Sequence, residues 1–497
     1  MPRTVVCIGA GPAGLTAGYL LCKEGLGVTV FEGDPQYVGG ISRTERYKEF
    51  SFDIGGHRFF SKSETVESLW NEILDEGFLE RPRKSRIYYN SKLFDYPLRA
   101  MDALSKLGVF EALLCVLSYV KSSAMPKRNP TNFEDWVTNK FGKRLFQTFF
   151  KTYTEKVWGM PCSEISADWA AQRIRGLSLL QAIWHSLRPQ RRGVPRGKVI
   201  KTLVDQFRYP RLGPGMLWEA AARKIEAAGG EVLLGHRVVS LRRAPDQQGW
   251  TVTAQTADGA LRTVTCDDVI STMPMPEMVA ALHPSPPPSV QAAAAGLKYR
   301  DFLVVALILK DRAKFDDNWI YIHDPGVKVG RIQNFKSWSP DLVPTPGLNC
   351  YGLEYFCFEG DPTWSSSDKD LIALATSELV TLGLADAGDV SDGRVVRQVK
   401  AYPVYDATYE SRVQVIRHEL EANYSGLHLV GRNGMHKYNN QDHAMMTAML
   451  TVKNIVAGRR LYDIWRVNQD AEYHEEATTP DAVPGIQPLG AMTPSTA

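Results

Sequence analysis

The chain has 497 residues, of which 44% are hydrophobic and 23% are charged, and its formal net charge is +3 at pH 7. These values are typical of an ordinary soluble globular protein, and the length is enough for about three domains. So small a net charge excludes nucleic acid recognition through global electrostatics, and we expect no nucleic acid partner.

The cysteines and the N-terminus indicate the compartment. The seven cysteines are scattered, with no CxxC pair and no Cys/His cluster of zinc-type spacing. We therefore expect reduced thiols, no metal and a cytoplasmic location.

Residues 1–4 run directly into the first expected strand and leave no room for a signal peptide. No stretch reaches the roughly 18 uncharged apolar residues that cross a bilayer, and no heptad or self-complementary patch indicates an oligomeric state.

The first 32 residues predict a dinucleotide site. A short apolar strand, a GxGxxG motif, a helix and a second strand follow one another within residues 5–31. Gly9 permits a tight turn, Gly11 lets the backbone approach a pyrophosphate, and Gly14 lets helix and strand pack closely. The helix N-terminus offers free N–H groups to phosphates. Glu32, at the end of the second strand, is placed to accept hydrogen bonds from a ribose.

A second glycine-rich segment, GGISRT at residues 39–44, refines this prediction. Gly39 and Gly40 allow another close backbone approach, and Arg43 suits a phosphate. The alternative is a glycine loop that merely precedes another strand. The segment resembles the GG-x-x-RT extension of flavoproteins in the superfamily of amine oxidase, protoporphyrinogen oxidase and UDP-galactopyranose mutase. This resemblance implies tightly bound FAD rather than exchangeable NAD.

The next part of the chain changes from strands to helices. Residues 50–60 alternate and then turn at a glycine pair, which suits a strand that feeds a loop over a cofactor. Residues 86–97 predict a hairpin around Asn90 and Ser91. Residues 100–187 are mostly helix-patterned. The basic loop at 188–198 is either a solvated connector or a patch for phosphates or an anionic membrane surface, so peripheral membrane contact stays open.

The second half returns to strands. Residues 213–281 alternate between helix and strand patterns, as a discontinuous cofactor domain would. Residues 300–420 predict an antiparallel sheet that forms a substrate floor. A strand at 427–432 ends at a glycine, and a helix follows at 442–456. After about residue 468 the composition is rich in Pro, Thr and Ala, which predicts a disordered tail.

These patterns predict an α/β fold with a Rossmann-like, discontinuous FAD-binding domain, a helical insertion domain and an antiparallel-sheet substrate domain. The expected boundaries are 1–90, 201–285 and 421–467 for FAD binding, 91–200 for the helical insertion, 286–420 for the substrate sheet and 468–497 for the tail.

Four further stretches resemble UDP-galactopyranose mutases, in the family's order over about 450 residues. The loop at 55–61 resembles GPHIFHT, residues 132–158 resemble NFEE…FFxxYTxKxW, residues 400–404 resemble YYPI, and residues 431–440 resemble GRLGTYKYLD. The chain departs from the family at Phe60, where a second histidine is expected, and at His436 and Asn440. These departures leave the substrate open.

The resemblance implies roles for individual residues. Those implied at the substrate are Tyr153, Trp158, Arg173, Arg331, Tyr355, Tyr402, Tyr438 and Asn440, with Arg175 as an equal alternative to Arg173. Those implied at the cofactor are Gly9, Gly11, Ala13, Gly14, Glu32, Gly39, Gly40, Ser42, Arg43, Gly55, Gly56, His57, Val238, Gly431 and Arg432. The implied catalytic set is His57, Arg331, Tyr402 and Tyr438. For each aromatic residue the alternative is plain core packing, and for a single arginine it is a surface ion pair.

The resemblance also implies a reaction on a small molecule, a nucleotide sugar. Reduced flavin N5 would attack the anomeric carbon while arginines hold the departing diphosphate, and the sugar would reclose on another hydroxyl. NAD(P)H could serve as the external reductant. The alternative is an FAD-dependent oxidoreductase that acts on a sugar, an amine or a lipidic substrate, with His57 or His436 handling a proton.

Overall fold

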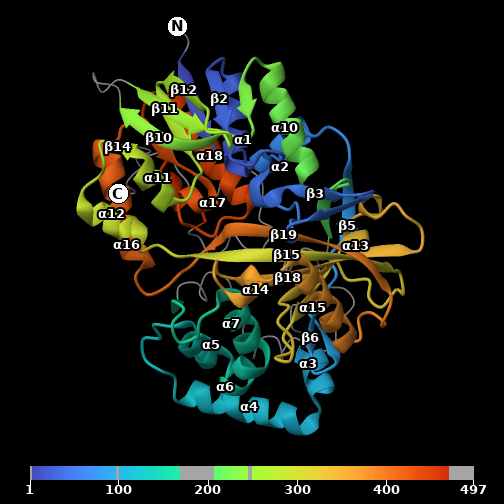
Figure 1. Cartoon of the computed structure of the whole chain (residues 1–497). Helices are drawn as coiled ribbons and strands as arrows, with labels where there is room; N and C mark the ends of the chain where they lie inside the picture. Colours follow the sequence, from blue (N-terminus) through green and yellow to red (C-terminus); the bar gives the residue numbers. More distant parts are fainter. Residues whose placement is uncertain (1–2, 97–99, 168–205, 244–248, 469–497) are drawn as a thin grey trace, which may run out of the picture.

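Three layers follow one another in the computed structural model, which describes residues 3–96, 100–167, 206–243 and 249–468. A parallel sheet with its helices lies at one end, long antiparallel strands cross the middle, and a group of helices forms the other end (Figure 1). Arg173, Arg175, the basic loop at 188–198 and the tail from 469 onward lie outside the described residues.

The parallel sheet has the strand order β20-β13-β1-β2-β9 and draws on widely separated parts of the chain. Its strands are apolar and buried, so helices must cover its faces. Helix α1 packs against both α10 and α18. The strands are β1 (Thr4–Ile8), β2 (Gly27–Phe31), β9 (Glu231–Leu233), β13 (Asp268–Ser271) and β20 (Leu427–Leu429), and the helices are α1 (Pro12–Lys23), α2 (Glu64–Ile73), α10 (Gly215–Ala227) and α18 (Gln441–Val456).

A four-stranded sheet, β12-β11-β10-β14, lies beside the parallel sheet. Its strands β11 and β12 pair in antiparallel fashion. Helix α12 packs against α16 and α11 on this side of the molecule. The bounds are β10 (Arg237–Arg243), β11 (Trp250–Gln255), β12 (Leu261–Cys266), β14 (Leu282–His283), α11 (Met275–Ala281), α12 (Pro288–Ala295) and α16 (Tyr409–Asn423).

The middle layer is a seven-stranded sheet of order β19-β15-β18-β17-β16-β6-β7. Its long strand β15, second from the edge, is buried at every residue but the last, because α15 covers one face and the rest of the protein covers the other. The bounds are β6 (Ser85–Tyr89), β7 (Lys92–Asp95), β15 (Tyr299–Lys310), β16 (Trp319–Ile322), β17 (Arg331–Asn334), β18 (Leu348–Cys357), β19 (Val390–Pro403), α13 (Phe335–Trp338), α14 (Pro362–Ser365) and α15 (Asp368–Thr381).

The hairpin β6–β7 has the predicted turn, with φ of 48° at Asn90 and 58° at Ser91, as expected for a tight two-residue connection. Its place in the fold differs from the expected division of the chain. Strand β6 pairs in parallel with β16, so the hairpin belongs to the middle sheet. The boundary set at residue 90 therefore cuts through a hairpin of this sheet, and the sheet is mixed rather than wholly antiparallel.

The remaining elements are the helical group and small connecting pieces. Helices α6 and α7 are joined by a π-helical turn that ends at Lys151, two residues before Tyr153. The helical group is α3 (Ala100–Leu107), α4 (Val109–Ala124), α5 (Phe133–Phe141), α6 (Lys143–Phe146), η2 (Gln147–Lys151) and α7 (Thr152–Trp158). The others are β3 (Thr44–Tyr47), β4 (Phe50–Asp53), β5 (Phe78–Pro82), β8 (Gln206–Pro210), α17 (Gly431–Gly434), η1 (Gly40–Ser42), η3 (Pro340–Leu342) and η4 (Ile464–Arg466). Within the described ranges, no helix combines the length and the apolar character that a membrane span requires.

Candidate functional site

A cavity of about 620 Å³ is lined by residues from several separate parts of the chain, between residues 8 and 96 and between residues 236 and 444. The start of α1, the end of β2 and the loop at 55–62 contribute to it, and so do β17, β19 and the segment 431–444. In α/β folds, ligands bind beyond the carboxyl ends of parallel strands. This cavity is therefore our candidate site.

The GxGxxG motif forms a cradle at one wall. Gly9 has φ of +95°, and a Cβ on Gly14 would lie 1.8 Å from the Gly9 carbonyl oxygen, so both positions require glycine. Gly11 differs, because a Cβ there would meet only the Cα of Gly40, at 4.0 Å. No side chain caps α1. Its first N–H groups and positive dipole therefore stay available to an anion, and the space beside Gly11 is open for it.

Glu32 occupies the position that the sequence predicts at the end of β2. Its carboxylate accepts hydrogen bonds from the backbone N–H of Ala10 at 2.6 Å and of Asp34 at 2.9 Å. Burial raises its pKa, against the effect of these backbone donors. Both Glu32 and Val238, at the start of β10, line the cavity. The carboxylate is thus held in place with lone pairs left for ligand hydroxyls.

Arg43 lines the cavity but is already engaged. Its Nε donates to Glu45 at 2.7 Å, and its Nη1 donates to Gln398 at 2.7 Å. Gly40 and Ser42 also line the cavity, whereas Gly39 shapes the turn with φ of +100°. Arg43 is therefore held beside the site by its own ion pair, rather than extended as an isolated cation.

The loop at 55–57 forms a second wall. Gly55 has φ of +111°, and a Cβ on it would lie 3.6 Å from His57 and 3.8 Å from Arg331. The ring Nδ1 of His57 lies 3.4 Å from the Ser42 hydroxyl. Its Nε2 is buried and has no hydrogen-bond partner in the described chain. A buried polar atom of this kind calls for a partner, which a bound cofactor or substrate would supply.

Arg331 projects from β17 toward this loop. Its Nε donates to Glu354 on β18 at 2.5 Å, and Glu354 also accepts from Gln333 at 2.7 Å. The Glu354 side chain is 0% exposed and that of Arg331 is 17% exposed. Among the described residues, only Glu354 accepts a hydrogen bond from Arg331. The guanidinium is therefore fixed through one nitrogen, with the other two left to bind an anion.

Arg432, from α17, also lines the cavity. Its donors go to the carbonyl oxygens of Asn439 and Ala401, at 2.9 and 3.1 Å, and no carboxylate of the described chain pairs with it. Its guanidinium lies 5.3 Å from the ring centre of Tyr402 and 4.9 Å from that of Tyr438. The two rings stack with centroids 5.5 Å apart. Arg432 thus brings an uncompensated positive charge to an aromatic wall.

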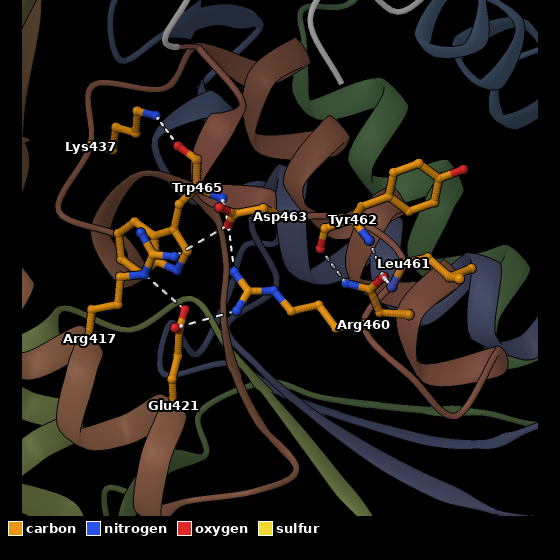
Figure 2. A network of polar contacts seen from close by, with 9 residues as sticks. Arg417, Glu421, Lys437, Arg460, Leu461, Tyr462, Asp463 and Trp465 are labelled. Carbon is orange, nitrogen blue, oxygen red and sulfur yellow. Dashed lines mark hydrogen bonds and ion pairs between the residues drawn. The ribbon is translucent and has the colours of Figure 1, made fainter. Parts of the chain in front are cut away.

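A C-terminal segment braces this wall. The ammonium of Lys437 donates to the Trp465 carbonyl at 2.9 Å, and Asn468 donates to the Tyr438 carbonyl at 3.0 Å. The segment is itself tied to α16 through Asp463 and Glu421, which accept from Arg417 and Arg460 (Figure 2). The position of Tyr438 and its neighbours therefore depends on contacts made by residues 463–468.

Three residues expected at the substrate do not line the cavity. Tyr153 stacks on His323, with ring centroids 5.0 Å apart, behind the cavity wall. Trp158 is 2% exposed and lies 6.4 Å from the Tyr438 ring, again behind the wall. Tyr355 corrects the prediction most clearly, because its hydroxyl donates to Glu378 of α15 on the opposite face of the sheet. Successive strand residues face opposite ways, so Glu354 lies on the sheet face that carries Arg331, and Tyr355 lies on the other face.

Of the remaining predicted residues in the described ranges, most line the cavity, and Gly14, Gly39 and His436 do not. His436, the second candidate for proton handling, is 2% exposed and lies outside the cavity, with its ring edge-on to Tyr299. The predicted residues that line it are Gly9, Gly11, Ala13, Glu32, Gly40, Ser42, Arg43, Gly55, Gly56, His57, Val238, Arg331, Tyr402, Gly431, Arg432, Tyr438 and Asn440.

The structure also adds residues that sequence reasoning missed. The guanidinium of Arg83 lies 5.8 Å from the Tyr96 ring centre and 5.9 Å from that of Trp319. Trp319 stacks on Trp338 and has a buried Nε1 without a hydrogen-bond partner in the described chain. Its alternation with Tyr321 in β16 is the one sequence signal for this wall.

Positive charge exceeds negative charge around the cavity. The lysine and arginine residues that line it are Arg43, Arg58, Lys62, Arg83, Arg237, Arg331, Lys400 and Arg432, against the carboxylates Glu32, Asp34, Glu277 and Asp442. Such a cavity attracts anionic ligands.

Burial, aided by the nearby charges of Arg432 and Arg331, lowers the pKa of His57 to about 3. The unfolded chain binds a proton on this residue near pH 6.5, whereas the folded chain does not until about pH 3. Falling pH therefore favours unfolding across this window.

We expect the free energy of unfolding of the wild type to fall relative to His57→Gln by about 1.4 kcal/mol per pH unit between roughly pH 6 and 4, in urea titrations. His418→Gln is the control, because that side chain is exposed, and it should follow the wild type. Parallel wild-type and His57→Gln curves would contradict the prediction.

A parallel sheet with an uncapped, glycine-led helix at its carboxyl edge, beside a cationic cavity, defines the class of dinucleotide-binding α/β proteins. Residues 12–448 match the family of flavin containing amine oxidoreductases, and the chain belongs to that family. The predicted superfamily membership is confirmed.

The comparisons include mutases among the similar proteins. A probable UDP-galactopyranose mutase of Klebsiella pneumoniae is 25% identical over 174 residues, and a dTDP-fucopyranose mutase of Escherichia coli is 29% identical over 173 residues. Each match covers 33% of this chain and 44% of the relative, which is less than half of its length. A crystal structure of reduced UDP-galactopyranose mutase shares the fold, with a TM-score of 0.80 and 21% identity over 95% of this chain and 98% of that one.

Proposed function

We propose that the protein is an FAD-dependent mutase that interconverts pyranose and furanose forms of a nucleotide sugar, and that the cavity holds both FAD and the sugar. The observation that carries this proposal is that two arginines from different elements, Arg331 of β17 and Arg432 of α17, both line the cavity. Arg331 and Arg432 both act electrostatically on His57 and Tyr402. Two guanidinium groups that line one cavity suit a diphosphate better than any neutral group.

The cofactor side of the proposal rests on residues that fit FAD. The N-terminus of α1 and the open space between Gly11 and Gly40 would receive the pyrophosphate. Glu32 would accept hydrogen bonds from the adenosine ribose. The unpartnered Nε2 of His57 would bond to the flavin or to a substrate beside it.

The residues of the chain have defined tasks in this reaction. When bound and reduced, the flavin would supply a nucleophilic N5 for the anomeric carbon. Arg331 and Arg432 hold the departing diphosphate, whose negative charge grows as the bond to the sugar breaks. Burial raises the pKa of Tyr402, with Tyr438 adding to the effect. Tyr402 therefore stays protonated at neutral pH and can donate a hydrogen bond to the diphosphate.

A second candidate is an FAD-dependent oxidoreductase of a sugar, an amine or a lipidic substrate. The observation that favours it is the aromatic wall of Trp319, Tyr321 and Trp338, which suits an apolar substrate body. The excess of cations around the cavity disfavours a protonated amine. NAD(P)H is the proposed external reductant for either reaction.

The test is a screen of nucleotide sugars against the purified, FAD-loaded protein. With dithionite-reduced protein, we expect conversion between pyranose and furanose forms, followed by NMR, with no net consumption of electrons. The oxidised protein is the matched control and should give no product. Stoichiometric bleaching of the flavin by a substrate, without ring interconversion, would select the oxidoreductase. A colourless protein that cannot be reconstituted with FAD would contradict both candidates.

A further inference from the structure

Helix α4 is amphipathic, and its apolar face is exposed to solvent, whereas an ordinary surface helix buries that face. Leu113, Val116, Leu117 and Val120 are 56%, 37%, 55% and 56% exposed, and with Val109 they follow the i, i+4, i+7, i+8 and i+11 spacing of one helix face. Surface helices normally turn such a stripe inward. Here the stripe faces outward along the whole helix.

The opposite face of α4 is the one that packs on the protein. Cys115 is buried there, and the Ser118 hydroxyl accepts from the backbone N–H of Arg144 at 3.1 Å. Glu111 pairs with the Arg144 guanidinium at 2.5 and 2.6 Å. These contacts fix the rotation of the helix about its axis. The apolar stripe is therefore held outward by polar contacts on the inner face.

The stripe lies at the end of the molecule farthest from the parallel sheet (Figure 1). Phe110, 76% exposed, and Met125, 78% exposed, extend it at the two ends of the helix. The helix has 16 residues, which corresponds to about 24 Å. A contiguous exposed apolar surface of this length marks an interaction site.

The charges around the stripe are mostly positive. Between residues 102 and 144 the cations are Lys106, Lys121, Lys127, Arg128, Lys140, Lys143 and Arg144, and the acids are Asp102, Glu111, Glu134 and Asp135. Three of these acids are already neutralised, Asp102 by Lys106, Glu111 by Arg144 and Asp135 by Lys127. Lys121 and Lys143 are exposed and form no ion pair within the described chain. The surface that surrounds the stripe therefore carries net positive charge.

We propose that the exposed stripe of α4, with its surrounding cations, docks the protein onto the surface of an anionic membrane. A helix of this kind lies in the plane of the interface with its apolar side chains among the acyl chains, and the cations meet the lipid phosphates. A second copy of the chain is disfavoured as the occupant. A two-fold contact places each patch against its own equivalent, so the net positive charge around one stripe would face the net positive charge around the other.

Vesicle co-sedimentation of the holoprotein tests the proposal. We expect binding to vesicles of phosphatidylcholine with phosphatidylglycerol, weaker binding to phosphatidylcholine alone, and loss of the difference in high salt. Leu113→Glu/Leu117→Glu should weaken binding about a hundredfold or more, since two large apolar side chains no longer insert. Lys121→Glu/Lys143→Glu should remove the preference for anionic vesicles.

The control variant introduces two glutamates on a different exposed surface, strand β12. Leu261 and Thr263 are exposed on β12, and Leu261→Glu/Thr263→Glu should bind like the wild type. No binding of the wild type to anionic vesicles would overturn the proposal. Equal weakening of binding by Leu113→Glu/Leu117→Glu and by the control Leu261→Glu/Thr263→Glu would also overturn it. So would a stable dimer in lipid-free solution that Leu113→Glu/Leu117→Glu dissociates, measured by light scattering, because a second copy would then be the occupant.

Discussion

Arg331→Ala should weaken the binding of UDP, used as a probe for a nucleoside diphosphate, at least about thirtyfold, because a buried guanidinium that contacts an anion contributes about 2–5 kcal/mol. The same change should destabilise the fold. Glu354 would remain 0% exposed without its cation, and breaking a buried pair in this way costs about 3–5 kcal/mol. Both effects are measurable, by titration calorimetry with UDP and by urea unfolding.

Two further variants separate these effects. Arg331→Ala/Glu354→Gln removes both charges, so we expect most of the stability to return while UDP binding stays weak. Glu354→Gln alone keeps the guanidinium and removes its counter-ion, so we expect UDP to bind as well as in the wild type or more tightly. If Arg331→Ala and Glu354→Gln had equal affinity for UDP, Arg331 would be only a structural ion pair and the proposed diphosphate clamp would be wrong.

The cofactor side of the site could be predicted from sequence because its determinants are local. Gly9, Gly11, Gly14 and Glu32 lie within 24 residues of each other, and one strand-turn-helix-strand unit fixes their relative positions. Gly55, Gly56 and His57 follow the same logic, since a glycine pair after a strand indicates a close backbone approach. In each case the chain geometry leaves little for distant contacts to decide.

The substrate side depends on strand pairing that the sequence does not encode locally. Strand β18 is buried on both faces, so its apolar pattern does not alternate, and nothing in it indicates whether Glu354 or Tyr355 faces the cavity. The choice follows from the pairing of Arg331 with Glu354 between β17 and β18. The position of Arg83 at the cavity likewise depends on strand pairing between distant parts of the chain. It reaches the cavity because β6 pairs with β16, over 230 positions away in sequence.

Competition from a nearby carboxylate explains why Arg43 is not free to bind a phosphate, as the sequence predicts it to be. Its position in the GGISRT segment suits a phosphate, yet Glu45, two residues later, lies on the same side of the extended chain and takes its Nε. The pair is buried on both sides, at 10% exposure of each side chain. A buried pair of this kind positions the cation and lowers its availability to a ligand.

Gly11→Ala should weaken the binding of FAD while leaving the fold intact, and it is the sharpest test of the cofactor site. A Cβ on Gly11 would meet only Gly40, at 4.0 Å, and the backbone there has φ of −79°, which alanine adopts without strain. The added methyl group would nevertheless occupy the space proposed for the pyrophosphate. Overpacking of this kind costs about 1–3 kcal/mol, which corresponds to roughly a five- to hundredfold weaker affinity for FAD. The flavin content of the purified protein and fluorescence titration with FAD measure it.

Two further glycine variants serve as controls for Gly11→Ala, one that should destabilise the fold and one that should change neither FAD binding nor stability. Gly14→Ala places a Cβ 1.8 Å from the Gly9 carbonyl oxygen, so it should lose both FAD and thermal stability. Gly326→Ala lies on an exposed turn outside the cavity and should retain both. Only Gly11→Ala is expected to lose FAD without a fall in the melting temperature of the apoprotein. A yellow Gly11→Ala protein with wild-type FAD affinity would place the pyrophosphate away from the N-terminus of α1, and the proposed orientation of FAD in the cavity would then be wrong.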